Sequence, residues 1–214
     1  MRECEEAIMP RMTEEQAARR KDEILDACDA LYRESAFQDI TIKDIAERTS
    51  LSRPSIYNYF ETIGEIFLGL LEREYSYWAN DLSAIAKDNE SLDLDKLASE
   101  IAYSLERRKT MLRIQAANLY EVEDTSRLER LADFKRAMRR AMDALDACLM
   151  KFLPPMERDD CETFRLAFFP FLCGVFAYAN PTEKQCRAMD NAGIPHRASS
   201  VYELSKNCLL QLLS

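Results

Sequence analysis

The sequence predicts an all-helical protein, and three observations support this fold class. Only 4 glycines and 7 prolines interrupt the 214 residues, whereas a sheet-rich chain needs many turn residues. Apolar residues recur at three- and four-residue steps over most of the chain, which is the period of an amphipathic helix. Serine or threonine precedes several of these segments, at the position of a helix N-cap. Because 47% of the residues are hydrophobic, the chain can also bury a sizeable core.

The helical pattern divides the chain into two domains of unequal size. A flexible arm is expected over residues 1–18, where no apolar period is sustained. A small domain follows over residues 19–61, and its first helix is expected over 19–34. The second domain is expected over residues 62–214.

Residues 41–60 predict two short helices joined by a tight turn. Thr41 stands at the N-cap of the first helix, and Asp44 completes a capping box. Ser52 caps the second helix, and Pro54 fits its first turn because a backbone N–H has no partner there. Two capped helices in this order are typical of a helix-turn-helix.

The second domain predicts a larger set of helices. Thr62 with Glu65 and Thr182 with Gln185 repeat the capping-box pattern. The expected spans are 62–86, 93–108, 110–121, 126–152, 158–179, 182–193 and 199–213. The longest apolar run, residues 166–179, is shorter than the roughly 18 residues of a membrane span, so it predicts a kinked core helix and no membrane insertion.

Composition excludes several classes of function. A net charge of -9 and a pI near 4.9 argue against bulk attraction to nucleic acid or to an anionic membrane. The acidic start of the chain does not resemble a secretory signal, so a cytoplasmic location is expected. The single histidine and 4 isolated glycines leave almost no material for catalytic triads, metal sites or phosphate loops. We therefore expect no enzyme activity, no metal and no cofactor.

The 7 cysteines are scattered and never spaced as CxxC, which argues against a disulfide scaffold. Most of them are expected to be small buried hydrophobes. The alternative is a redox-sensing thiol, for which Cys173 and Cys186 are the candidates.

The second helix of the helix-turn-helix carries side chains suited to DNA. Arg53, Ser55, Tyr57 and Asn58 lie in its N-terminal half and can reach base edges in a major groove. The segment is slightly basic inside an acidic protein. An ordinary helical hairpin with a solvated charged edge fits the same pattern equally well.

The motif of this segment consists of Thr-Ile-Lys-Asp-Ile-Ala at 41–46, Leu-Ser-Arg-Pro-Ser-Ile-Tyr-Asn-Tyr-Phe at 51–60 and Gly-Glu-Ile-Phe at 64–67. It resembles the DNA-binding domain of the TetR (tetracycline-repressor) family of bacterial transcription regulators, from about Lys21 to Phe67. The resemblance implies an all-helical homodimer in which three N-terminal helices bind operator DNA. It also implies a long fourth helix and a larger domain that binds a small-molecule effector and dimerises.

The resemblance assigns roles to residues position by position. Base or groove contacts are implied for Lys43, Arg53, Pro54, Ser55 and Tyr57. Phosphate contact or support of the recognition helix is implied for Thr41, Ser52, Asn58 and Tyr59. Two positions depart from the family pattern. Ser50 replaces the usual turn glycine, which would cost about 1 kcal/mol if that residue needs a positive φ, and Ile63 replaces a lysine that reaches a phosphate.

The second domain is rich in aromatic residues, which at helical spacing usually form core. The resemblance implies a mostly apolar effector cavity among them. Candidate lining residues are Tyr75, Trp78, Arg113, Asn118, Glu121, Phe168 and Phe171. The implied dimer interface is a four-helix bundle of residues 159–179 and 199–213 from both copies, so the pair Leu209→Glu and Leu212→Glu is expected to yield monomers.

Two functions remain open from the sequence. The first is a ligand-responsive repressor that binds palindromic operator DNA as a homodimer and is released by a small, mostly apolar effector. The second is a protein of the same fold that senses a ligand, a partner or a thiol oxidant and binds DNA weakly or not at all. Lys43, Arg53 and Tyr57 distinguish the first, while Ile63 and the acidic net charge give the second some weight.

Overall fold

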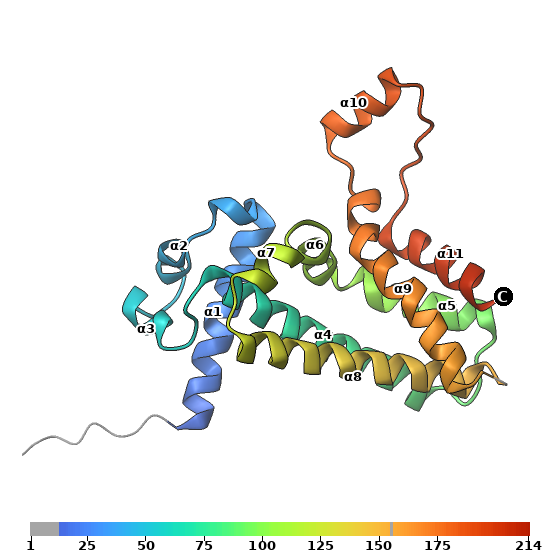
Figure 1. The fold of residues 1–214 in the computed structure, drawn as a ribbon, viewed down its shortest axis with the longest axis horizontal. Helices are drawn as coiled ribbons and strands as arrows, with labels where there is room; N and C mark the ends of the chain where they lie inside the picture. The colour runs from blue at the N-terminus through green and yellow to red at the C-terminus, as the bar shows by residue number, and fades with distance from the viewer. Residues whose placement is uncertain (1–12, 155) are drawn as a thin grey trace, which may run out of the picture. The chain divides into compact units, whose positions relative to one another are not determined.

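The computed structural model describes residues 13–154 and 156–214, and every regular element within them is helical, which confirms the all-α fold class (Figure 1). Residue contacts divide the chain into two compact units, one ending at Glu61 and the other beginning at Thr62. Each unit has its own buried core.

Within its described residues, 13–61, the first unit contains three α-helices and one 3-10 turn. They are α1 (Glu14–Glu34), η1 (Phe37–Asp39), α2 (Ile42–Glu47) and α3 (Arg53–Tyr57). Ile24, Ile45 and Ile56, one from each helix, are fully buried and form the centre of this core. The apolar faces predicted for these helices therefore pack against one another, which holds α2 and α3 at a fixed angle on α1.

Helix α1 begins at Glu14, earlier than the expected start at residue 19. The reason is a capping box: the Thr13 Oγ1 atom accepts from the Gln16 backbone N–H at 3.2 Å, and the Gln16 side chain accepts from the Thr13 N–H at 3.0 Å. Residues 13–18 are therefore part of a capped helix. The rest of the expected arm, residues 1–12, lies outside the described residues.

The second unit contains eight helices within the described residues. They are α4 (Ile63–Asp88), α5 (Leu94–Glu106), α6 (Lys109–Ala117), α7 (Leu119–Asp124), α8 (Leu128–Phe152), α9 (Arg158–Ala179), α10 (Glu183–Asn191) and α11 (Val201–Leu213). Helices α4 and α8 lie side by side along most of their length (Figure 1). Helix α11 packs on α5 and α9, and α6 packs on α9.

One helix expected over residues 110–121 is two helices in the structure. Asn118 separates α6 from α7 with φ -136° and ψ 0°, while its N–H still donates to the Ile114 carbonyl at 2.8 Å. Asparagine favours such breaks because its side chain competes with the backbone for hydrogen bonds. The prediction of a continuous helix was therefore wrong at this point.

Helix α9 passes through Pro170 without ending. Among the described residues it is the one helix that is long and apolar enough, by length and composition, to cross a membrane. Phe164, Phe168 and Leu172 are buried in the second unit, and 33% of the apolar window of α9 is buried in all. One helix of this kind is weak evidence for a membrane span.

Helix α10 differs from the other helices because none of its residues is buried. Figure 1 shows it standing off from α9 and α11, which precede and follow it in the chain. Its predicted capping box is confirmed, since Thr182 Oγ1 accepts from the Gln185 N–H at 3.2 Å and the Gln185 side chain accepts from the Thr182 N–H at 2.8 Å.

Candidate functional site

The first helix of the helix-turn-helix is held at its start by the predicted capping box. The Asp44 carboxylate accepts from the Thr41 N–H at 2.8 Å and from the Thr41 hydroxyl at 2.6 Å. These hydrogen bonds lower the pKa of Asp44, so the box is intact at neutral pH and is lost as the pH falls through that lowered pKa. Thr41 and Lys43 are left exposed beside it.

The turn between α2 and α3 carries no backbone strain at Ser50. Among the described residues no non-glycine residue has a positive φ, so the expected cost of replacing glycine there does not arise. Instead, both the N–H and the hydroxyl of Ser50 donate to the carboxylate of Glu23 on α1, the hydroxyl at 3.1 Å. The serine therefore ties the turn to α1.

Helix α3 is placed by a cap on one side and by core residues on the other. The Ser52 hydroxyl accepts from the Ser55 N–H at 3.4 Å, and the two hydroxyls lie 2.8 Å apart. Ile56 is fully buried and Tyr59 is 6% exposed. Of the two roles implied for Tyr59, the structure therefore fits support of the recognition helix and leaves little surface for contact with DNA.

The remaining residues predicted to meet DNA are on the surface of α2 and α3. Arg53, Pro54 and Tyr57 are exposed, and Ser55 is half-buried. The Arg53 guanidinium donates to the Tyr57 hydroxyl at 3.3 Å and lies 5.8 Å from the centre of its ring, so the two side chains form one projecting group. The further exposed members of the set are Thr41, Lys43, Ser52 and Asn58.

The exposed cations near this surface are partly neutralised by neighbouring carboxylates. Lys43 lies 3.7 Å from Glu47. Arg48 donates to Glu34 at 2.6 Å, which lowers the pKa of Glu34 and raises that of Arg48. Arg53 differs from these two cations. Its described contacts are with the hydroxyl and the ring of Tyr57 and include no carboxylate, so the charge of its guanidinium faces outward.

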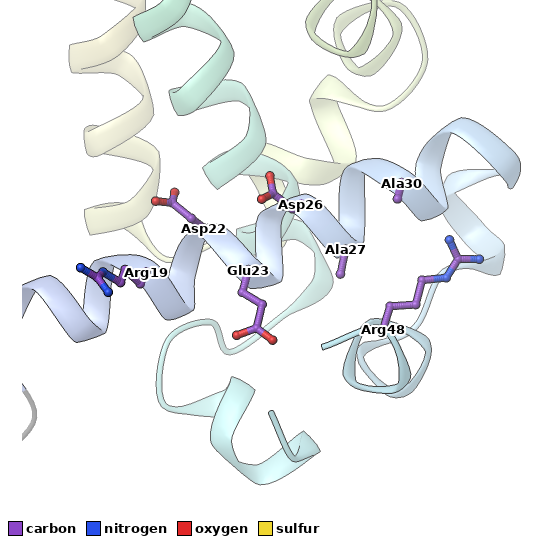
Figure 2. A pocket seen from close by; sticks show the side chains of 7 residues that line it. All are labelled: Arg19, Asp22, Glu23, Asp26, Ala27, Ala30 and Arg48. Carbon is purple, nitrogen blue, oxygen red and sulfur yellow. The ribbon is translucent and has the colours of Figure 1, made fainter. Parts of the chain in front are cut away.

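An open groove of about 530 Å³ lies elsewhere on the first unit, along α1 and next to the end of α2 (Figure 2). Its lining residues are Arg19, Asp22, Glu23, Asp26, Ala27, Ala30 and Arg48. Three carboxylates against two guanidinium groups make it a poor site for phosphate. The groove shares no residue with the exposed set on α2 and α3, so it lies outside the candidate DNA surface.

The second unit brings two of the predicted effector residues, Tyr75 and Trp78, together, whereas the ring contacts of Phe168 are with Phe164 and Phe171. Tyr75, Trp78 and Phe168 are fully buried. The ring centroid of Tyr75 lies 6.1 Å from that of Trp78 and 5.7 Å from that of Phe134. Trp78 also lies 6.1 Å from Phe169 and donates through Nε1 to the Ser104 hydroxyl at 3.0 Å. Helices α4, α8 and α9 thus share an aromatic centre.

The other predicted effector residues are distributed differently. Phe171 is half-buried and stacks on Phe168 with ring centroids 5.9 Å apart. Arg113 is half-buried on α6, and Asn118 is buried at the break between α6 and α7. Glu121 is exposed on α7, and its backbone carbonyl accepts from the Thr125 hydroxyl. The structure therefore does not bring Glu121 to the aromatic centre.

One polar residue in the aromatic centre was not found from the sequence. Gln115 is 7% exposed, and its Nε2 atom donates to the Tyr75 hydroxyl at 2.8 Å. The available signal was its position, since Gln115 follows Met111 by one helical turn on the buried face of α6. A polar residue on an apolar stripe indicates a buried hydrogen bond or a site.

The first turn of α4 is joined tightly to the segment between α7 and α8. Glu65 is fully buried, and its carboxylate accepts from the Arg127 Nε atom at 2.5 Å and from its terminal nitrogen at 2.8 Å. Of the predicted capping box, Thr62 accepts from the Glu65 N–H, while the Glu65 carboxylate faces Arg127. A Cβ atom on Gly64 would overlap the Thr125 hydroxyl, so this close approach requires glycine.

The described cysteines differ in burial. Cys28, Cys148 and Cys161 are buried, and burial raises the pKa of the Cys148 thiol to about 11. Cys173 is half-buried, and burial followed by the nearby Glu123 carboxylate raises its pKa. A raised pKa reduces the thiolate fraction on which oxidation depends.

A helix-turn-helix unit with an exposed basic and aromatic group, followed by a helical unit with a buried aromatic centre, defines a DNA-binding regulator with a sensory domain. The comparison with known families agrees. Residues 24–70 match the family described as "Bacterial regulatory proteins, tetR family", and residues 72–210 match "Tetracyclin repressor-like, C-terminal domain". The chain belongs to the TetR family of transcriptional regulators, and its larger unit is the ligand-binding domain of that family.

Individual relatives are distant. An uncharacterized HTH-type transcriptional regulator, YfiR of Bacillus subtilis, is 33% identical over 65 residues, which is 30% of this chain and 32% of that protein. The fatty acid degradation regulator FadR of Bacillus halodurans has a similar fold, with TM-score 0.60, 15% identity and coverage of 91% of this chain and 95% of that one. FadR of Bacillus subtilis in complex with stearoyl-CoA gives TM-score 0.59 and 15% identity, over 90% and 97% of the two chains.

Proposed function

We propose that this regulator is a repressor that binds a palindromic operator as a homodimer and is released by a small, mostly apolar effector. The observation that carries the proposal is the exposed Arg53 and Tyr57 group on α3, since a planar guanidinium beside an aromatic hydroxyl suits base edges in a major groove. Lys43 and Thr41 at the exposed start of α2 add groups that suit backbone phosphates. A protein of this kind acts in the cytoplasm, where the chromosome is.

The effector is proposed to bind at the aromatic centre of Tyr75 and Trp78, against which the rings of Phe134 and Phe169 pack. Helices α4, α8 and α9 supply apolar rings there, and apolar rings with a few polar groups are the usual lining of a small-molecule site. The Bacillus subtilis FadR neighbour, which has this fold, was solved with stearoyl-CoA, a molecule with a long apolar chain. Such an effector would release DNA by stabilising one shape of the dimer.

A gel shift with the DNA upstream of the protein's own gene tests the proposal. Wild-type protein is expected to retard this DNA, and an unrelated fragment of equal length should compete poorly. The alternative is a sensor of this fold with weak or no DNA binding. It is favoured if both fragments bind equally weakly. The raised pKa of Cys173 speaks against this thiol as a sensor and leaves Cys186 as the candidate of the thiol-sensing form.

Replacing Ile63 by lysine should strengthen operator binding. Ile63 is the first residue of α4, and the family resemblance implies a phosphate-binding lysine there. One added phosphate contact in each copy makes the plot of log Kd against log salt steeper by about one counterion per copy, or about two for the proposed dimer. Fluorescence anisotropy over a series of salt concentrations measures this slope. An unchanged slope would contradict the implied position of Ile63 on the DNA.

The dimer interface is proposed to lie on the outer faces of α9 and α11. Leu166 is 73% exposed, Tyr178 is 82% exposed and Leu212 is 39% exposed, so these two helices present apolar surface that a second copy can cover. Leu209 differs from them, because it is fully buried inside the protomer. Leu209→Glu would place a charge in the core, so the pair Leu209→Glu and Leu212→Glu cannot distinguish loss of the dimer from loss of the fold.

The variant Leu166→Glu with Leu212→Glu tests this interface instead. Both side chains are exposed in the protomer, so the charges should leave the fold intact and separate the copies. Light scattering after size exclusion is expected to give the mass of a monomer. Leu128→Glu is the matched control, since Leu128 is 76% exposed on α8. A dimer that persists in the double variant would move the interface to another face.

A further inference from the structure

The buried pair of Tyr75 and Gln115 has hydrogen-bonding capacity that the protein does not use. Gln115 Nε2 donates to the Tyr75 hydroxyl at 2.8 Å, while the Gln115 Oε1 atom is buried and has no hydrogen-bond partner among the described residues. No described acceptor is recorded for the Tyr75 hydroxyl proton. The pair therefore presents one acceptor and one donor side by side. Exchanging the amide oxygen and nitrogen of Gln115 leaves the same balance.

Leaving such groups without partners is unfavourable. A buried polar atom without a partner costs about 1–3 kcal/mol relative to a satisfied one, so each such atom in a native core needs an explanation. Ionisation of Tyr75 does not explain the missing partners, because burial, followed by the nearby Cys173, raises the pKa of its hydroxyl. Tyr75 therefore remains a neutral donor at physiological pH.

The surroundings of the pair suit an amphiphilic molecule. The rings of Trp78 and Phe134 pack against Tyr75 and form an apolar wall. Cys173 and Glu123 both act electrostatically on Tyr75. Cys173 is half-buried, and the Glu123 side chain, paired with Lys135 at 2.6 Å, is 26% exposed.

We propose that Gln115 and Tyr75 bind the head group of the effector, and that this head group is neutral and carries both a hydrogen-bond donor and an acceptor, as an alcohol does. This inference rests on the proposed effector site and adds the chemical class of the effector. An effector hydroxyl donates to Gln115 Oε1 and accepts from the Tyr75 hydroxyl, while its apolar body lies against the aromatic rings. Ethers, esters, thioesters and ionised carboxylates lack the donor, so they leave Oε1 unsatisfied and bind more weakly.

The single tryptophan of the chain allows a direct test. Trp78 is fully buried and next to Tyr75, so its fluorescence reports occupation of this site without any label. The full-length protein is titrated with straight-chain alcohols from hexanol to decanol and with the methyl ether of each alcohol. The alcohol is expected to bind at least about tenfold more tightly than its ether, the ratio that corresponds to one lost hydrogen bond.

Two variants and one control assign the effect to the pair. In Gln115→Leu and in Tyr75→Phe, the preference for the alcohol should shrink to less than about threefold, because a partner of the hydroxyl is gone. Gln38→Leu, at an exposed position in the first unit, should keep the full preference. Far-UV circular dichroism verifies that each variant is folded.

The outcomes separate this inference from the proposed function. Equal binding of alcohols and ethers by wild-type protein overturns the head-group assignment but leaves an apolar effector site. The head-group assignment is likewise overturned if Gln115→Leu keeps the preference for the alcohol over its ether while Trp78 fluorescence still reports binding. If no alcohol changes Trp78 fluorescence, both the head-group assignment and the effector site at the aromatic centre are wrong. DNA binding, measured separately by gel shift, is unaffected by any of these results.

Discussion

Arg127→Ala is expected to lower the free energy of unfolding of the second unit by about 3 kcal/mol, the loss typical of breaking a buried ion pair. Glu65 is fully buried, and the guanidinium of Arg127 is the group that the structure places on both of its carboxylate oxygens. Removing that group leaves a buried carboxylate with much less compensation, although the 43% exposure of the Arg127 side chain lets water reach the site. Urea unfolding followed by Trp78 fluorescence measures the change.

Two controls make this result specific to the buried pair. Glu65→Met combined with Arg127→Met removes both charges and should recover most of the lost stability, because no charge is then left buried. Arg187→Ala removes the exposed ion pair with Glu183 on α10, whose side chains are 75% and 79% exposed, and should cost less than about 0.5 kcal/mol. A loss in the double variant as large as that in Arg127→Ala would mean that Arg127 acts through packing and not through its charge.

Arg53→Ala is expected to weaken operator binding about a hundredfold. Each copy of the proposed dimer loses one guanidinium at the DNA, and a good contact to a base edge is worth about 1–3 kcal/mol, so two copies together give about two powers of ten or more. Arg53 is exposed at the first position of α3, so its loss should not disturb the fold. Fluorescence anisotropy with labelled upstream DNA measures the dissociation constant.

The control for Arg53 is an arginine of equal charge elsewhere. Arg139 on α8 is 81% exposed, and Arg139→Ala should change the dissociation constant less than about twofold. Tyr57→Phe keeps the ring but removes the hydroxyl that accepts from Arg53, so its effect should lie between the two. Equal losses in Arg53→Ala and Arg139→Ala would indicate binding through net charge alone.

Helices and their starts were predictable because the responsible signals are local. The boxes at Thr41 and Thr182 involve residues three apart, and the apolar stripes of α1, α4 and α11 repeat within a turn or two. The candidate DNA residues followed from the same local segment. The start of α1 at Glu14 was not predicted, although the capping box at Thr13 is equally local, because residues 13–18 show no sustained apolar period.

The features that sequence reasoning missed depend on residues distant in the chain. Glu65 pairs with a residue 62 positions away, which turns a predicted capping side chain into half of a buried ion pair. Gln115 finds Tyr75 at a separation of 40, and Leu209 is buried by neighbouring helices although its pattern fitted an interface equally well. Periodicity indicates which face of a helix is apolar, but not which other surface covers that face.

Hydroxyl-radical footprinting of wild-type protein on the DNA upstream of its own gene tests the central claim most directly. Two recognition helices in one dimer should protect two short segments of DNA. The segments should be separated by about one helical turn, roughly 34 Å, or by a small multiple of it, and the protected bases should form a palindrome. Arg53→Ala should remove both segments together. Uniform weak protection along the fragment, unchanged in Arg53→Ala, would contradict the account of α2 and α3 as an operator-binding surface.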